Sequence, residues 1–163
     1  MITNEKELEN YIIEDDDFCK FIEELCGLKY VSVVDNQVHV GDKNIIDVLC
    51  IGLETEEKEC LVVVELKFRP LEAKDFAQVG RYITALLDVG IYPIDHIQAV
   101  LIGTGVTDEC AYIINGEVLD DDIKVAVIEN KLSYYEATNH WFKCIDTSGQ
   151  ISPRLKEISK EKK

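Results

Sequence analysis

The sequence predicts a single mixed α/β domain in which two helices precede a β meander, a long helix and further strands. Three observations carry this prediction. Apolar residues recur at helical spacing before Gly27, alternate or run together between residues 30 and 68, and return to helical spacing between residues 72 and 89. With 163 residues and 47% apolar content, the chain is long enough to build its own core.

Two helices are expected at the N-terminus. The first spans about residues 4–13, where apolar side chains recur at helical spacing and Thr3 is placed to cap the helix. The second has the same period before Gly27, which is expected to end it, at Phe18, Phe21, Ile22 and Leu25.

The pattern then changes to that of strands. We expect strands at residues 30–34 and 38–40, separated by a turn at Asp35 and Asn36, and further strands at 45–52 and 61–68. These strands predict an antiparallel meander. The polar loop at residues 54–59 joins the last two strands, and the continuous apolar run at its far side is typical of a central strand covered on both faces.

A helix at residues 72–89 and a strand at 97–102 follow the meander, with Gly103 to Gly105 expected as a turn. Two more strands are expected, at residues 111–114 and 124–128, with a turn at Asn115 and Gly116 between them. The domain is taken as residues 1–153. Residues 154–163, which hold five basic and two acidic groups, are expected to form a flexible basic tail.

Charge and composition limit the function. The formal net charge of −15 is unusual for a protein that handles polyanions. The six cysteines form no CxxC pair, so we expect buried free thiols rather than a zinc site or disulfides, and the three histidines (His39, His96 and His140) lack a partner pattern. No apolar run is long enough for a membrane span, and the glutamate-rich start does not resemble a signal peptide, which favours a cytoplasmic protein without a membrane partner.

Glu65 and Lys67 stand at the end of the apolar strand. Separated by one residue, they leave the same face of the sheet, so they need partners, a metal or a wet cleft. The alternative is that they only mark where the strand emerges into solvent. Asp47 lies within the adjacent apolar strand. Asp47 and Glu65 are each nine residues from Glu56, near the middle of the connecting loop, so pairing of the two strands would place them opposite each other. Two facing carboxylates are destabilising without a cation between them, and hard oxygen ligands suit Mg²⁺ or Mn²⁺.

The segment ending at Lys67 reads IIDVLCIG, a variable loop, then LVVVELK, and it resembles motifs II and III of the PD-(D/E)XK nuclease superfamily. Gln78 and Tyr82 in AQVGRYI are similar to the Q-x-x-x-Y motif of its RecB-type branch. The opening segment NEKELENYI resembles the first helix of the superfamily, particularly in mismatch-cleaving endonucleases. The resemblance implies a restriction-endonuclease-like core, with a mixed central sheet in αβββαβ order flanked by helices.

The same resemblance implies a site and an activity. Its catalytic residues would be Asp47, Glu65, Lys67, Gln78 and Tyr82, and its metal-binding positions Asp47, Glu65, Leu66 and Glu5. Glu9 shares a helix face with Glu5 and is the fallback, and ordinary surface charge is the alternative for both. The implied function is a nuclease that uses Mg²⁺ or Mn²⁺, with DNA as the expected nucleic acid.

Phosphate contacts would come from basic residues near the site, Arg69, Lys74 and Arg81, for which surface solubility is the competing interpretation. Dimerisation or a protein partner is plausible, because one domain of this size offers only a short cleft. The competing function is a non-catalytic domain that keeps the fold and acts as a protein-binding or regulatory module, which the net charge of −15 favours.

Overall fold

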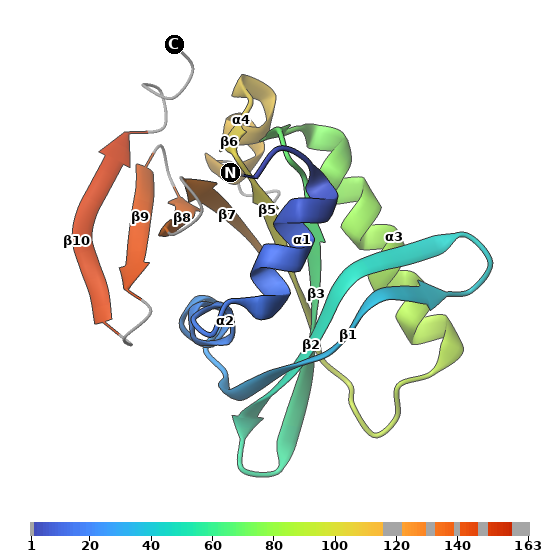
Figure 1. The fold of residues 1–163 in the computed structure, drawn as a ribbon. Helices are drawn as coiled ribbons and strands as arrows, with labels where there is room; N and C mark the ends of the chain where they lie inside the picture. The colour runs from blue at the N-terminus through green and yellow to red at the C-terminus, as the bar shows by residue number, and fades with distance from the viewer. Residues whose placement is uncertain (1, 116–121, 130–132, 139–140, 147–149, 158–163) are drawn as a thin grey trace.

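The computed structural model describes residues 2–115, 122–129, 133–138, 141–146 and 150–157. The N-terminal half contains α1 (Glu5–Glu14), α2 (Phe18–Cys26), β1 (Lys29–Val40), β2 (Asn44–Thr55), β3 (Lys58–Leu66) and β4 (Pro70–Leu71). The rest contains α3 (Ala73–Val89), β5 (Ile97–Gly103), β6 (Gly105–Val106), α4 (Asp108–Asn115), β7 (Ile123–Glu129), β8 (Ser133–Thr138), β9 (Trp141–Asp146) and β10 (Gln150–Glu157) (Figure 1).

One mixed sheet organises the described residues, with strand order β1-β2-β3-β5-β7-β8-β9-β10. The first three strands form the expected antiparallel meander, β3, β5 and β7 run parallel, and the remaining strands are antiparallel. Helix α3 makes the crossover between β3 and β5. The predicted α/β class, with a mixed sheet flanked by helices, is confirmed.

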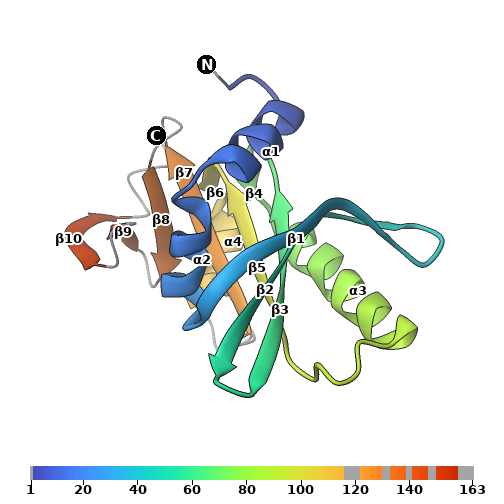
Figure 2. The same ribbon diagram turned by 60° about the horizontal axis from the view of Figure 1, so that its bottom comes forward.

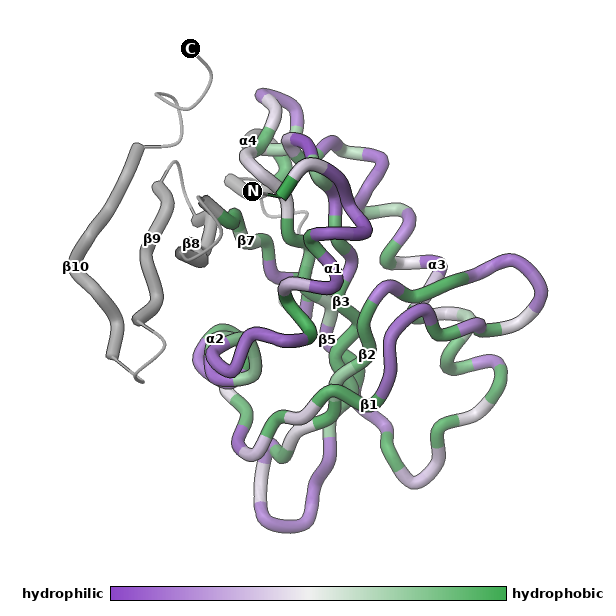
Figure 3. The backbone as a smooth tube through the Cα atoms, in the orientation of Figure 1, coloured by the Kyte–Doolittle hydropathy of each residue, from purple (hydrophilic) through white to green (hydrophobic). Residues whose placement is uncertain are grey.

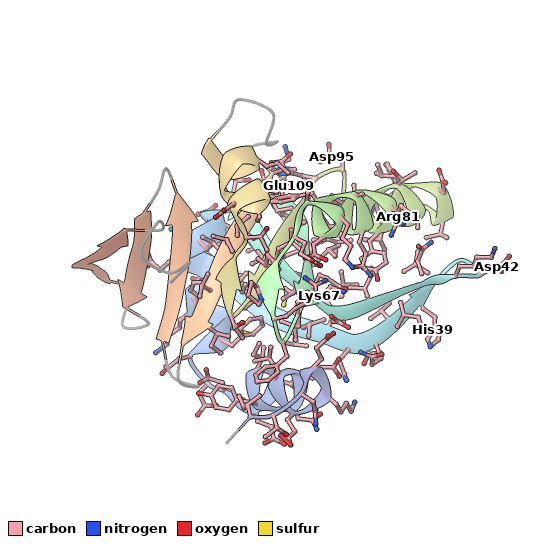
Figure 4. The ribbon with its side chains drawn as sticks, turned by 90° about the horizontal axis from the view of Figure 1, so that it is seen from above. His39, Asp42, Lys67, Arg81, Asp95 and Glu109 are labelled. Carbon is pink, nitrogen blue, oxygen red and sulfur yellow. The ribbon has the colours of Figure 1, made fainter. Side chains whose placement is uncertain are left out.

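Helices cover the two faces of this sheet separately. Helices α1 and α2 pack on one face, where Val62 and Val64 of β3 point, and α3 with α4 packs on the other, where Leu61 and Val63 point. Figure 4 shows α3 and α1 on opposite sides of the sheet, and Figure 2 shows the same layers from a different side. Strand β3 is therefore apolar on both faces, as its uninterrupted apolar run predicts, and the tube in Figure 3 is hydrophobic along most of it.

The β1–β2 hairpin separates from β3 at a defined point. Pairing of β2 with β3 reaches Val48↔Val64 as its last recorded pair, whereas β1 and β2 stay paired as far as Val40↔Asn44. The end of the hairpin therefore leaves the sheet as a two-stranded ribbon (Figure 1). Asp47 and Glu65 stand directly beyond the last pair, in the register predicted from the sequence.

Two expectations about the N-terminal region are wrong in detail. Asn4 caps α1 by accepting a hydrogen bond from the Glu7 N–H, while the Thr3 hydroxyl instead donates to the Glu7 carboxylate. The turn expected at Asp35 and Asn36 is absent, because β1 continues through this segment with a register shift between Val33 and Asp35. Polar residues there mark a bulge in a long strand, a feature that resembles a turn in sequence.

The segment at residues 111–114 was expected as a strand but forms part of α4. A short apolar run fits either structure, and the acidic first turn of α4, with Asp108 and Glu109, was the helical signal. Asn115 ends this helix, and Gly116 lies outside the described residues. The tail expected from residue 154 begins within β10, which continues to Glu157, and residues 158–163 lie outside the described residues.

Candidate active site

Glu65 is buried where the hairpin leaves the sheet. Its side chain is 4% exposed, its Oε2 lies 3.3 Å from Lys67 Nζ, and its Oε1 is the buried side-chain oxygen without a hydrogen-bond partner among the residues that the structure describes. Burial, followed by the nearby Asp47 carboxylate, raises the pKa of Glu65 to about 8. An ionised carboxylate is costly at this position unless a cation accompanies it.

Asp47 completes the carboxylate pair from β2. Its Oδ2 accepts a hydrogen bond of 2.9 Å from the Leu66 N–H, so a side chain takes up a main-chain donor just beyond the last recorded pair of the ladder. Its Oδ1 lies 3.3 Å from Gln37 Nε2. Burial raises the pKa of Asp47, against the lowering effect of the Leu66 hydrogen bond. Both acids are therefore held in place and both resist ionisation.

The Leu66 side chain points away from these acids. It is 1% exposed and packs in the core beneath α1 and α2, on the face opposite Glu65 and Lys67. As a metal-binding position, Leu66 can therefore offer only its main-chain carbonyl oxygen. This alternation of charged and apolar side chains is the one predicted for a strand.

Helix α3 brings Gln78 and Tyr82 together. Gln78 Nε2 donates to the Tyr82 hydroxyl over 2.9 Å, as expected for residues one turn apart. Tyr82 is 6% exposed. Burial, followed by the charge of Glu65, raises the pKa of Tyr82 to about 12, so the phenol is close enough to the acids to sense them. The structure thus brings five predicted residues to one region: Asp47, Glu65, Lys67, Gln78 and Tyr82.

Helix α1 brings both candidate glutamates, Glu9 and Glu5, to the edge of this region, and Glu9 is the buried one. Glu9 is 3% exposed and accepts hydrogen bonds from Asn36 Nδ2 at 3.0 Å and from Gln37 Nε2. Because Gln37 also contacts Asp47, it links the helix acid to the carboxylate pair. Glu5 is exposed, one turn earlier, at the wall of a pocket of about 200 Å³ that Glu9, Gln37 and Asp47 also line.

Sequence reasoning missed Gln37 and Asn36. Gln37 adopts a left-handed backbone conformation, with φ of 50°, next to the bulge in β1. This conformation is uncommon for a residue other than glycine and departs from the regular alternation of a strand. Periodicity alone therefore could not place the Gln37 side chain. The positive φ has a cost, which is typical of positions that hold a functional side chain.

The three basic residues predicted to contact phosphate differ in their availability. The Arg69 guanidinium donates two hydrogen bonds to Asp75, at 2.8 and 2.9 Å, so the N–H groups on this edge are already engaged by a buried carboxylate. Lys74 is exposed and lies 3.4 Å from Glu72. Arg81 is exposed on α3 (Figure 4). It lies beside a groove of about 560 Å³ that reaches Asn44 on the hairpin. Among the three, Arg81 is best placed to meet a ligand.

The residues present fit a divalent cation. Two carboxylates share a site, and one of their oxygens is buried with no hydrogen-bond partner among the described residues. The side chains supply the hard oxygen donors that Mg²⁺ and Mn²⁺ prefer. A bound cation would stabilise the ionised carboxylates against the burial that raises the pKa of both Asp47 and Glu65. Lys67 pairs with Glu65 and Lys6 pairs with Glu9, each over 3.3 Å, so two recorded ammonium groups face three acids.

The fold class follows from these observations: the chain has a restriction-endonuclease-like α/β core. A comparison with solved structures finds similarity to a repair endonuclease from Pyrococcus abyssi, with a TM-score of 0.53 and 19% sequence identity over 79% of this chain. The matched part is 48% of that protein, so this chain spans about half its length. No known protein-family description matches the chain, and no curated protein matches it either. No helix among the described residues is long and apolar enough to cross a membrane.

Proposed function

We propose that the protein is a metal-dependent nuclease that hydrolyses phosphodiester bonds in nucleic acid, with DNA as the expected substrate. The observation that carries this proposal is the buried Glu65 oxygen, which has no hydrogen-bond partner in the part of the chain that the structure describes and lies beside Asp47 and Lys67. The fold shared with a repair endonuclease supports it. Asp47 and Glu65, with the Leu66 carbonyl, would hold Mg²⁺ or Mn²⁺.

The bound ion would supply Lewis-acid polarisation of the phosphate and an acidified water. Lys67, whose Nζ is 3.3 Å from Glu65, stabilises negative charge on the phosphate oxygens. Gln78 and Tyr82, joined by their hydrogen bond, orient the substrate from α3. Glu9 holds Gln37 and thereby Asp47, so it takes the role of the helix glutamate for which Glu5 was the first choice.

A digestion panel tests the activity. Labelled single- and double-stranded DNA and RNA would be incubated with the protein and Mn²⁺, Mg²⁺ or EDTA. We expect cleavage of at least one substrate with metal and none with EDTA, and Asp47→Asn should remove it. Asp42→Asn, the same change at an exposed position at the end of the hairpin, should cleave like the parent (Figure 4).

The second candidate is a non-catalytic module with the same fold, and two observations favour it. The net charge of −15 opposes binding of polyanions, and Arg69 and Lys74 already contact acids. Metal binding alone does not distinguish the two candidate functions, so nucleic-acid binding must be measured as well. If the protein binds Mn²⁺ but neither cleaves nor binds any substrate of the panel, the module becomes the better proposal.

A further inference from the structure

A second group of metal-ligand side chains lies at the opposite end of β3 from Glu65. Glu54 near the end of β2, Cys60 near the start of β3 and His96 directly before β5 each place one ligand atom within 4.8 Å of the others. Cys60 and Glu65 are about 16 Å apart along the strand, at the usual rise of about 3.3 Å per residue. This cluster is therefore separate from the proposed nuclease site.

The ligand atoms of the cluster differ in kind from those of the nuclease site. A carboxylate oxygen, a thiol sulfur and an imidazole nitrogen form the mixed set that Zn²⁺ and Co²⁺ accept in tetrahedral sites. Asp47 and Glu65 offer only oxygen, which suits Mg²⁺ or Mn²⁺. The two sites are thus expected to select different ions.

His96 is held in a fixed orientation. Its Nε2 lies 2.8 Å from Asp122 Oδ1, just before β7, and its Nδ1 contacts Glu54 Oε1. A histidine that binds metal through one ring nitrogen commonly has the other bonded to a carboxylate, which fixes its tautomer. Asp122 is placed to be that partner. Nδ1 is then left facing Glu54 and Cys60.

Glu54 is also held in a fixed orientation. Its Oε1 contacts His96 Nδ1, so the carboxylate and the imidazole already face each other as a pair of ligand groups. Lys58 Nζ lies 3.8 Å from Glu54 Oε2, the other carboxylate oxygen, so Oε1 remains directed at His96.

The cluster is open enough for an ion to enter and enclosed enough to hold one. Cys60 is fully buried, and Gln98 Nε2 lies 3.7 Å from its sulfur. The side chains of Glu54 and His96 are 22% and 29% exposed, so solvent reaches the cluster from their side. Open positions in such sites are filled by water.

We propose that Glu54, Cys60 and His96 bind one Zn²⁺ or similar transition-metal ion, with Asp122 as the positioning residue for His96. The ion ties the closed end of the β2–β3 hairpin to the start of β5 and, through Asp122, to the start of β7. The ion would thus link one end of the central strands, while the proposed nuclease site occupies the other end.

Cobalt titration of the full, reduced chain in excess Mg²⁺ tests this site. We expect one Co²⁺ per chain and a near-ultraviolet absorption from cobalt bound to thiolate. Cys60→Ser should remove this absorption, and His96→Gln should weaken Co²⁺ binding more than 100-fold. Asp122→Asn should keep the absorption but weaken binding about 10- to 100-fold, as loss of a partner behind a ligand does.

Matched variants separate this site from other thiols, histidines and the nuclease site. Cys19→Ser, His39→Gln and Asp47→Asn should all bind Co²⁺ like the parent, since none of these residues belongs to the cluster. Circular dichroism would confirm that each variant folds, and His96→Gln decides the matter if Cys60→Ser does not fold. No thiolate absorption at saturating Co²⁺, unchanged binding in His96→Gln, or binding lost only in Asp47→Asn would overturn the proposal.

Discussion

Burial of the Glu65 carboxylate should make the stability of the folded protein depend on pH. In the folded protein its pKa is raised from 4.5 to about 8, so without metal the folded state holds a proton that the unfolded chain releases. Its contribution to stability is complete below about pH 4.5 and is lost as the pH rises through about 8. A divalent cation would remove this dependence, because it stabilises the ionised form.

Glu65→Gln keeps the shape of the protonated acid and cannot ionise. In EDTA, the parent should lose stability relative to this variant by more than about 1 kcal/mol between about pH 5 and about pH 9. Urea denaturation at several pH values measures the difference. Parallel pH curves for the two proteins would show that Glu65 does not titrate in this range.

Lys67 and Glu65 are adjacent but have different expected roles. Lys67→Ala removes a charge that matters mainly as charge develops on the phosphate, so Mn²⁺ binding should persist while cleavage slows about 100-fold or more. Glu65→Ala removes a ligand and should weaken Mn²⁺ binding itself. Calorimetric Mn²⁺ titration and cleavage rates measure the two effects. Equal loss of Mn²⁺ affinity in both variants would contradict the separate roles.

At the scale of elements, the chain that leaves β3 passes very close to β5. A Cβ added at Gly103 would lie 2.7 Å from Leu71 Cγ and 2.8 Å from the Arg69 carbonyl oxygen, whereas one at Gly105 would have its nearest neighbour at 4.0 Å. Glycine at position 103 therefore allows the segment after Lys67 to cross the end of β5. The hydrogen bond from the Lys67 N–H to the Ile102 carbonyl belongs to the same crossing.

Gly103→Ala should lower the free energy of unfolding by about 1–3 kcal/mol, because the backbone at Arg69 must move. It should also slow cleavage by displacing Lys67. Gly105→Ala, the matched change two residues on, should leave both nearly unchanged. Thermal melts and cleavage assays of the two variants test this pair, and similar effects in both would show that the crossing is not tight.

The sequence predicts the elements around the carboxylates well because their signals are local. The register that places Asp47 opposite Glu65 depends only on the short β2–β3 connection, and it continues the recorded pairing Val48↔Val64. The role of Gln37 could not be predicted, since it depends on a bulge and a left-handed backbone. The choice between Glu5 and Glu9 depends on the position of α1 along the sheet. Packing of Leu8 and Ile12 in the core sets that position.

The cluster around His96 shows a further limit of sequence reasoning. Glu54 and Cys60 flank the β2–β3 turn, whereas His96 directly precedes β5 and Asp122 directly precedes β7, so no local spacing joins all four residues. Only the order of the strands, β2-β3-β5-β7, brings them side by side. A sequence without CxxC pairs therefore still places a thiol and an imidazole together.

For the whole molecule, the net charge of −15 makes nucleic-acid binding depend on the metal. Distant acids are screened beyond about 8 to 10 Å at physiological ionic strength, so the local charge of the site decides. Without a cation that site gathers the acids Asp47, Glu65 and Glu9 around Lys67 and Lys6, and Glu65 holds a proton below about pH 8, so the site has no net positive charge to offer a phosphate. A divalent ion would displace that proton, add positive charge and allow phosphate to approach.

Ca²⁺ should therefore increase the anisotropy of a labelled oligonucleotide relative to EDTA, and Asp47→Asn should respond much less. Arg81→Ala should weaken Ca²⁺-dependent binding and reduce its salt dependence, since Arg81 is exposed beside the groove on α3. Lys20→Ala, exposed on α2 across the sheet, is the matched control and should bind like the parent. Binding that ignores Ca²⁺ would contradict the metal-dependent account.

Binding of Mn²⁺ by Asp47 and Glu65 is the claim on which the proposed activity rests, and the melting temperature of the folded chain tests it most directly. At about 100 times the dissociation constant, Mn²⁺ should stabilise the fold by about 2.7 kcal/mol, a rise of roughly 5 °C or more for a chain of this size. The rise should be lost in Asp47→Asn and kept in Asp42→Asn. No Mn²⁺-dependent rise in the parent at millimolar metal and low salt, or an equal rise in both variants, would contradict a metal site at Asp47 and Glu65.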